Sequence, residues 1–63
     1  MFEFTADRVK AIRFRLGLTQ AEFAARLGVH LRTVQGWELG DSSPRRGPLI
    51  KALLDAEASI PVA

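Results

Sequence analysis

The 63-residue sequence contains no cysteine, which excludes disulfide bonds and thiolate metal sites. Its single histidine, His30, has no second histidine to pair with as a ligand, so no metal and no cofactor are expected. No apolar run approaches the roughly 18 residues that a membrane helix needs. Charged residues between Asp7 and Arg13 interrupt the region where a signal peptide would be apolar. We therefore expect one soluble domain over residues 1–63, located in the cytoplasm and without a membrane partner.

The chain is also too short to favour an enzyme. A domain of this size buries only about 60% of the surface that its unfolded chain exposes, which leaves little room for an enclosed cleft. No nucleophile–base pairing and no glycine-rich phosphate loop is visible in the sequence. The apolar content of 48% argues against disorder. A small folded binding domain is the remaining class.

The charge total is a weak signal, but the identity and position of the charges are more informative. Nine Lys and Arg against seven Asp and Glu give a net charge of only +2. Most of the basic residues are arginine, whose planar fork suits phosphate and guanine. The stretch from Arg8 to Arg15 holds basic residues and no acidic one. Charge distribution therefore favours nucleic acid more than net charge does.

Helix start and stop signals predict the first two helices. Thr5 is a plausible N-cap, because its hydroxyl can accept from a backbone N–H that lacks an intrahelical partner. A helix from there would end at Leu16. Thr19 to Glu22 fits the capping box, in which the threonine and glutamate side chains each accept from the other's backbone N–H. This second helix would end before Gly28, which can adopt the left-handed conformation.

Two further helices follow. His30 is a less usual N-cap for a third helix, which should run to about Leu39 and stop at Gly40. Residues 41–47 form a polar loop, and Pro48 suits the first position of a fourth helix. Residues 59–63 should be irregular. Inward-facing apolar positions recur at helical spacing: Val9, Ile12, Leu16, Phe23, Ala24, Leu27, Val34, Trp37, Leu49, Ile50, Leu53 and Leu54. The expected fold is all-α, with a helix-turn-helix core over residues 19–39.

Many positions in register resemble the repressor/Cro-type (xenobiotic-response-element) helix-turn-helix family. The matching segments are Leu16 to Ala24, Leu27-Gly28-Val29, Thr33-Val34 and Trp37-Glu38 with Gly40. The resemblance covers about residues 9–54 and implies a compact, lambda-repressor-like domain of four or five helices. It also implies a bacterial or phage protein that binds DNA in the cytoplasm or nucleoid. The stretch from Trp37 to Pro44 resembles the small DNA-binding antitoxins as well.

A helical wheel at about 100° per residue predicts which face of the third helix meets DNA. If Val34 points inward, Trp37 and Glu38 flank it, and the outer face holds Arg32, Gly36 and Leu39, with Gln35 at its edge. That outer face would enter the major groove. The positions that read bases in the family correspond here to His30, Leu31, Arg32 and Gly36, and Gln35 is added as a base or phosphate contact. Arg32 is the best candidate, since its fork can pair with guanine.

Gly36 and the phosphate contacts complete the expected interface. Glycine inside a helix costs about 1 kcal/mol relative to alanine, so Gly36 marks either a close approach to DNA or a tolerated surface position. Gln20 stands at the N-terminus of the second helix, and by resemblance it is the family's phosphate-contacting glutamine. The other expected phosphate contacts are Thr33, Arg45 and Arg46. The two loop arginines could also be an ordinary solvated basic loop.

Arg13 and Glu38 are expected to be structural. Each lies beside the inner face of its helix, and the family often pairs such an arginine and glutamate. A partly buried pair would matter, because removing one partner strands a charge, at about 3–5 kcal/mol in the buried limit. An exposed pair would contribute only about 0–1 kcal/mol.

The function expected from these features is a sequence-specific, DNA-binding regulator that reads an operator half-site with residues 30–39. We expect a weak homodimer on a two-fold operator, because one small domain makes few contacts. Phe2, Phe14, Ile60 and Val62 could form an exposed interface, or the termini could fold back and cover Phe14. The alternative function is a protein-interaction module, or an antitoxin with a toxin partner, in which DNA binding is secondary or absent.

Overall fold

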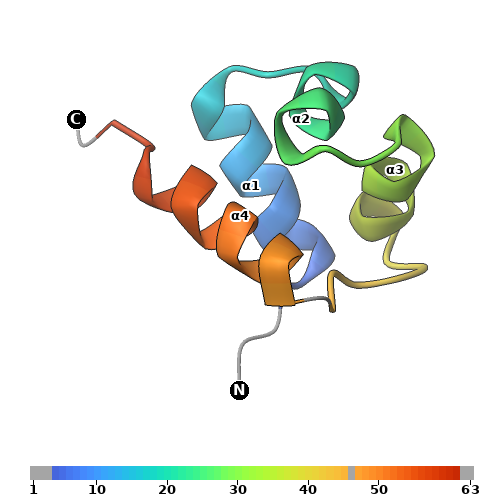
Figure 1. Cartoon of the computed structure of the whole chain (residues 1–63). Coiled ribbons are helices and arrows are strands. Elements are labelled where there is room, and N and C mark those ends of the chain that lie inside the picture. Colours follow the sequence, from blue (N-terminus) through green and yellow to red (C-terminus); the bar gives the residue numbers. More distant parts are fainter. Residues whose placement is uncertain (1–3, 46, 62–63) are drawn as a thin grey trace.

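The computed structural model describes residues 4–45 and 47–61, and this part of the chain contains four helices and no strand. The helices are α1 (Ala6–Leu16), α2 (Gln20–Leu27), α3 (Leu31–Leu39) and α4 (Gly47–Ala58). The all-α prediction is confirmed. Figure 1 shows α4 crossing in front of α1, with α3 at the opposite edge of the molecule, and α4 also packs against α2.

Side-chain caps fix the starts of the first two helices. Thr5 Oγ1 accepts from the backbone N–H of Arg8 at 3.2 Å. Thr19 Oγ1 accepts from the N–H of Glu22 at 3.1 Å, and Glu22 Oε1 accepts from the N–H of Thr19 at 2.8 Å. Both halves of the predicted capping box are therefore formed. These bonds satisfy N–H groups that no helical carbonyl can reach.

A glycine makes the sharp turn between α2 and α3. Gly28 has φ +73°, in the left-handed region where residues with a Cβ are strained. Its N–H and that of Val29 bond back to the carbonyls of Ala25 and Ala24. This Schellman-like end satisfies the last carbonyls of α2 and sends the chain directly into α3.

The fourth helix differs slightly from its prediction. It begins at Gly47, so Pro48 is its second residue rather than its first. The missing N–H of Pro48 still falls in the first turn, where no intrahelical acceptor is needed. At the other end, Ser59 Oγ donates to the carbonyl of Ala56 at 2.7 Å and accepts from Arg26 Nη2 at 3.0 Å. Ile60 then packs against the core.

One apolar core joins all four helices. Its buried members are Phe4, Val9, Ile12, Phe23, Ala24, Val34, Trp37, Leu53 and Ala56. Leu16, Leu27, Leu49, Ile50 and Leu54 pack around this cluster while staying partly exposed. Pro44, inside the loop that was expected to be polar, is also buried. The loop after α3 is thus held against the domain by one apolar anchor.

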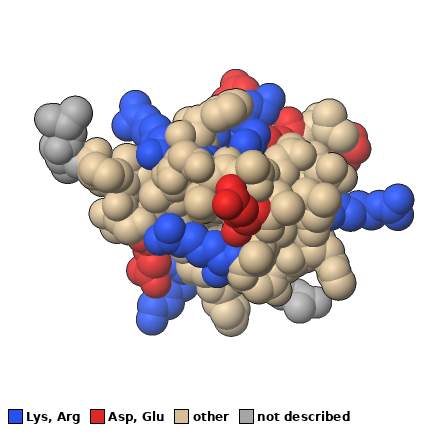
Figure 2. All heavy atoms as spheres, turned by 90° about the horizontal axis from the view of Figure 1, so that it is seen from above, with Lys and Arg blue, Asp and Glu red and all other residues tan. Residues whose placement is uncertain are grey.

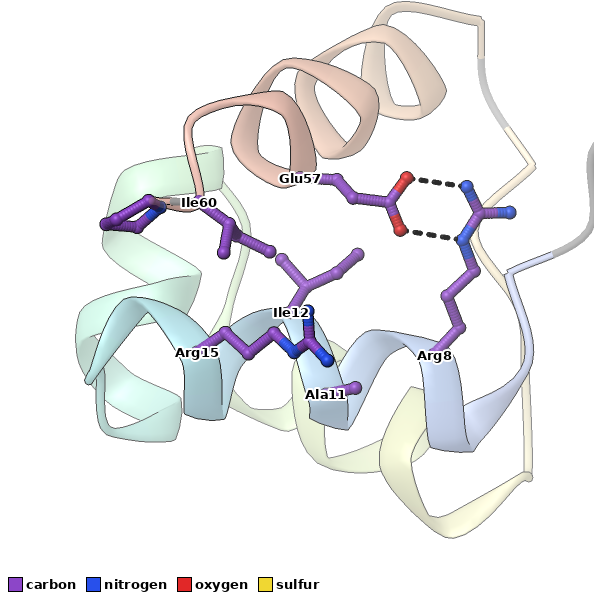
Figure 3. A pocket seen from close by; sticks show the side chains of 7 residues that line it. Arg8, Ala11, Ile12, Arg15, Glu57 and Ile60 are labelled. Atoms are coloured by element: carbon purple, nitrogen blue, oxygen red, sulfur yellow. Dashed lines mark hydrogen bonds and ion pairs between the residues drawn. The ribbon is translucent and has the colours of Figure 1, made fainter. Parts of the chain in front are cut away.

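An ion pair that was not predicted connects the first helix to the last (Figure 3). Arg8 donates to both carboxylate oxygens of Glu57, at 3.0 and 2.7 Å. The Arg8 guanidinium also lies 4.2 Å from the ring centroid of Phe4, at cation–π distance. Beside the pair, Arg15 and Ile60 line a shallow pocket between α1 and the end of α4.

Candidate nucleic-acid interface

The third helix has one face in the core and one face exposed. Val34, Trp37 and Glu38 are its buried residues. Leu31, Arg32, Gln35 and Leu39 are exposed. Arg32 and Leu39 lie across the helix from Val34 and Gln35 lies at the edge of that face, as the helical period predicts. Leu31 lies only about 60° from Val34, and it is exposed as the first residue of the helix. Figure 1 shows α3 at the edge of the molecule, where its outer side can meet another macromolecule.

Most side chains that were expected to contact bases are accessible. His30 is the N-cap residue of α3, but it makes no side-chain cap hydrogen bond, and it is exposed. Arg32 and Gln35 are exposed on the first two turns, while Leu31 is 42% exposed. The face thus offers a guanidinium, an amide and an imidazole beside an apolar group.

Gly36 is half-buried, and the cause is within the protein. A Cβ built on Gly36 would lie 3.2 Å from Ser42 Oγ in the loop that follows α3. The backbone N–H groups of Asp41 and Ser42 point at the Gly36 carbonyl, at 3.0 and 3.4 Å. The sequence left two interpretations of this glycine open: a close approach of the helix to DNA, or a tolerated surface position. Close packing of the loop on the helix is a third reason that the sequence did not reveal.

The expected phosphate-contacting residues lie within α3 and on either side of it. Gln20 is the first residue of α2. The backbone N–H groups of Gln20 and Ala21 have no intrahelical carbonyl to bond to, so they are free to bind a phosphate. Thr33 is half-buried, and Arg45 is exposed in the loop before α4. Arg46 lies outside the described residues.

The side chains of Arg13 and Glu38 form a two-point ion pair. Arg13 Nε and Nη2 donate to the two oxygens of Glu38 at 2.7 and 3.0 Å. Only 12% of the arginine side chain and 4% of the glutamate side chain are exposed. Arg13 Nη1 also donates to the carbonyl of Leu18 at 3.1 Å, and Gln20 Nε2 donates to Glu38 Oε1 at 3.2 Å. These bonds fix α3 relative to α1 and to the start of α2.

The electrostatics of Glu38 reflect this network. Burial by itself raises the pKa of the carboxyl, because the charged form loses water. Hydrogen bonds from Arg13 and Gln20, with the positive charges of Arg13 and Lys10, outweigh burial and hold the Glu38 pKa below its usual value. The carboxylate therefore stays ionised at neutral pH. Gln20 uses its side-chain N–H on this network, so in this conformation its backbone is better placed than its amide to meet a phosphate.

Residues 9–53 match the family model described as "Helix-turn-helix". That span is more than half of the 63 residues, and it contains the capping box of α2, the Gly28 turn and the exposed helix described above. The chain belongs to the repressor/Cro-type helix-turn-helix family. Searches of curated proteins and of solved structures found no match. In general terms, this repressor/Cro-type domain is a DNA-binding transcriptional regulator.

Two exposed apolar side chains lie beside the interface of this repressor/Cro-type domain. Phe14 is 63% exposed and Leu39 is 76% exposed, and both line a hollow where α1, α2 and α3 meet. Lys10 lines the same hollow, although the sequence gave no reason to single it out from the other basic residues of α1. The Arg13 guanidinium lies 4.5 Å from the Phe14 ring centroid. Phe14 is therefore not covered by the described part of the termini.

Basic side chains of the repressor/Cro-type domain are dispersed on the face seen in Figure 2. Blue Lys and Arg side chains lie at several places along its rim and also across its middle, with uncharged surface and acidic groups between them. Among the described residues, this face therefore presents separate cations and no single large basic patch. None of the described helices combines the length and the apolar character needed to cross a membrane.

Proposed function

We propose that this protein is a sequence-specific transcriptional regulator of the repressor/Cro kind, which reads an operator half-site with α3. The observation that carries the proposal is that the inner face of this helix is held both by the apolar core and by an ion-pair network. Val34 and Trp37 are buried in the core, and Glu38 is tied to Arg13 and Gln20. The opposite face stays exposed with Arg32 at its centre. A rigid helix with a free outer face is what insertion into a major groove requires.

Each accessible group has a chemical role in this proposal. Arg32 donates two hydrogen bonds to guanine O6 and N7, which is the commonest specific contact to DNA. His30 and Gln35 offer further polar contacts to bases, and Leu31 meets a thymine methyl. Backbone N–H groups at Gln20, the hydroxyl of Thr33 and the charges of Arg45 and Arg46 hold phosphates and set the orientation of the domain. Gly36 has no side chain to offer, and it packs against Ser42 of the following loop.

We further propose that two copies bind a two-fold operator as a weak homodimer. One domain of this size presents one recognition helix, and two helices in successive major grooves supply affinity and a palindromic site. The exposed side of α4, which includes Lys51 and Ala58, is the suggested contact together with the chain ends. Ile60 packs on the core and is less available for it. Phe2 and Val62 lie outside the described residues.

Fluorescence anisotropy with labelled duplex DNA tests the DNA-binding proposal. Binding to a random duplex should be measurable at low salt and should fall steeply as salt rises, because phosphate contacts release counterions. Selection from a randomised duplex pool should then return a two-fold consensus sequence. A protein that binds no duplex even at low salt would contradict the proposal.

A second candidate function is a protein-interaction module, such as an antitoxin that binds a toxin. The exposure of Phe14 and Leu39 around one hollow favours it, because clustered apolar surface is typical of protein contacts. The low net charge of +2 also agrees with it. The same titration bears on this candidate, since binding that is absent even at low salt would favour the interaction module.

A further inference from the structure

The loop after α3 covers part of the face that the proposed function assigns to DNA. The N–H groups of Asp41 and Ser42 point at the carbonyl of Gly36, at 3.0 and 3.4 Å. Pro44, two residues further on, is buried and anchors the loop from its other end. Ser42 is therefore held against α3 from both directions, although Ser42 itself remains exposed.

The hydroxyl of Ser42 lies beside the place where a side chain of residue 36 would begin. A Cβ on Gly36 would lie 3.2 Å from Ser42 Oγ, closer than an ordinary contact. Residue 36 is about 160° around the helix from Val34, so its Cβ direction points away from the core. Arg32 precedes Gly36 by one turn and shares this outer face. Ser42 Oγ and the Arg32 guanidinium thus belong to one surface, although they come from different segments.

We propose that Ser42 is a base-contacting residue that stands in for the absent side chain at position 36. A serine hydroxyl both donates and accepts, so it can bond to either kind of group on a base edge. Ser42 Oγ makes no hydrogen bond to another described residue, which leaves both functions available to DNA. The recognition surface then combines Arg32 from the helix with a hydroxyl from the loop. This inference rests on the proposed DNA-binding function.

Serine-to-alanine variants at two neighbouring positions test this assignment. Ser42→Ala should weaken binding to the selected operator about three- to ten-fold, the range expected for one hydrogen bond, and should leave binding to a random duplex unchanged. Ser43→Ala is the matched control, because Ser43 is exposed in the same loop without the contact to Gly36. It should leave both affinities unchanged. Thermal melts should show both variants as stable as the wild type.

Gly36→Ala provides a second, independent test. Its new methyl group would press on Ser42 Oγ and force the hydroxyl to shift or rotate, so operator affinity should fall by no more than it does with Ser42→Ala. In the Ser42→Ala background, Gly36→Ala should cause little further loss, because the displaced group is already missing. Additive losses in the double variant would contradict a shared role.

The outcomes separate this inference from the function on which it rests. A wild type that binds no duplex at low salt overturns both. A wild type that selects an operator, and loses affinity with Arg32→Ala but not with Ser42→Ala, overturns only the role of Ser42. Equal losses on operator and random duplex with Ser42→Ala would also overturn base contact, since a phosphate contact carries no sequence preference.

Discussion

Arg32 is the only arginine of α3, and its exposed position separates it from the two arginines that the fold uses in ion pairs. Arg8 and Arg13 each donate twice to one carboxylate, so their guanidinium groups are committed to the protein. The charge of Arg32 is not offset in this way within the described part of the chain. At the residue scale, the same side-chain type thus serves two different purposes according to its partner.

Arg32→Ala should therefore weaken binding to the selected operator by about 1–3 kcal/mol, the scale of one good bidentate pair with guanine. Binding to random duplex should fall much less. Arg45→Ala is the matched control, because an exposed loop arginine that meets phosphate should lower both affinities alike. Anisotropy titrations on the two duplexes measure the difference. Equal losses on both duplexes with Arg32→Ala would remove it from base recognition.

Glu38 should control part of the pH dependence of stability. Its pKa is lowered in the folded state, so its contribution is present above about pH 4.5, the unfolded value, and is lost as pH falls through the folded value. At pH 7, Glu38→Gln should destabilise the fold strongly, toward the roughly 3–5 kcal/mol of a broken buried pair. The difference from wild type should shrink below pH 4.5.

Urea denaturation of both proteins between pH 7 and pH 3 measures this effect, with Arg13→Ala and the double variant completing the cycle. If Glu38→Gln and Arg13→Ala each unfold at the same urea concentration as the wild type, the Arg13–Glu38 pair stabilises the fold by no more than an exposed pair does, about 0–1 kcal/mol.

At the scale of elements, the sequence predicted most of what is local. The Thr19–Glu22 capping box, the Gly28 turn and the inward positions of α3 depend on residues within a few positions of one another, and periodicity reveals them. The contact of Ser42 with Gly36, the burial of Pro44 and the Arg8–Glu57 pair were not predicted. Each depends on how the chain packs after its helices form, and neither spacing nor composition encodes that geometry.

For the candidate site, too, the sequence predicted what depends on one helix and missed what depends on contacts between helices. Wheel positions identified the exposed face of α3, because that face is fixed by the buried positions of Val34 and Trp37. The side-chain bond from Gln20 to Glu38 could not be found in this way, since it joins residues 18 positions apart on two helices. Lys10 was missed for a similar reason: its neighbours in the hollow come from α2 and α3 as well as α1.

The turn between α2 and α3 gives a prediction at this scale. Gly28→Ala should destabilise the domain by about 1 kcal/mol, because its φ of +73° strains a residue with a Cβ, even though nothing lies within 4 Å of the new atom. Gly47→Ala is the control: it also has open space, but not a positive φ, and should be neutral or stabilising. Thermal melts compare the two. Equal stability of both variants would contradict the strain.

For the whole molecule, the central prediction concerns assembly on DNA. We expect two subunits per operator duplex, and a weak, concentration-dependent dimer without DNA, measured by sedimentation equilibrium. Ala58→Glu should weaken the free dimer, because it places a charge at the exposed end of α4. Its melting temperature should match the wild type, since Ala58 is outside the core. A wild type that remains monomeric at high concentration and binds one subunit per operator would contradict the dimer.

The Arg8–Glu57 ion pair also has a consequence for folding kinetics. Its partners are 49 positions apart, so the contact must close nearly the whole chain into a loop, and the entropy of that closure is lost before the pair forms. We therefore expect the pair to be absent from the folding transition state. Arg8→Ala should speed unfolding and leave the refolding rate almost unchanged in stopped-flow urea experiments. Slower refolding would mean that the first and last helices meet early. In the expected case, the pair lengthens the time for which the folded domain persists and does not change how fast it forms.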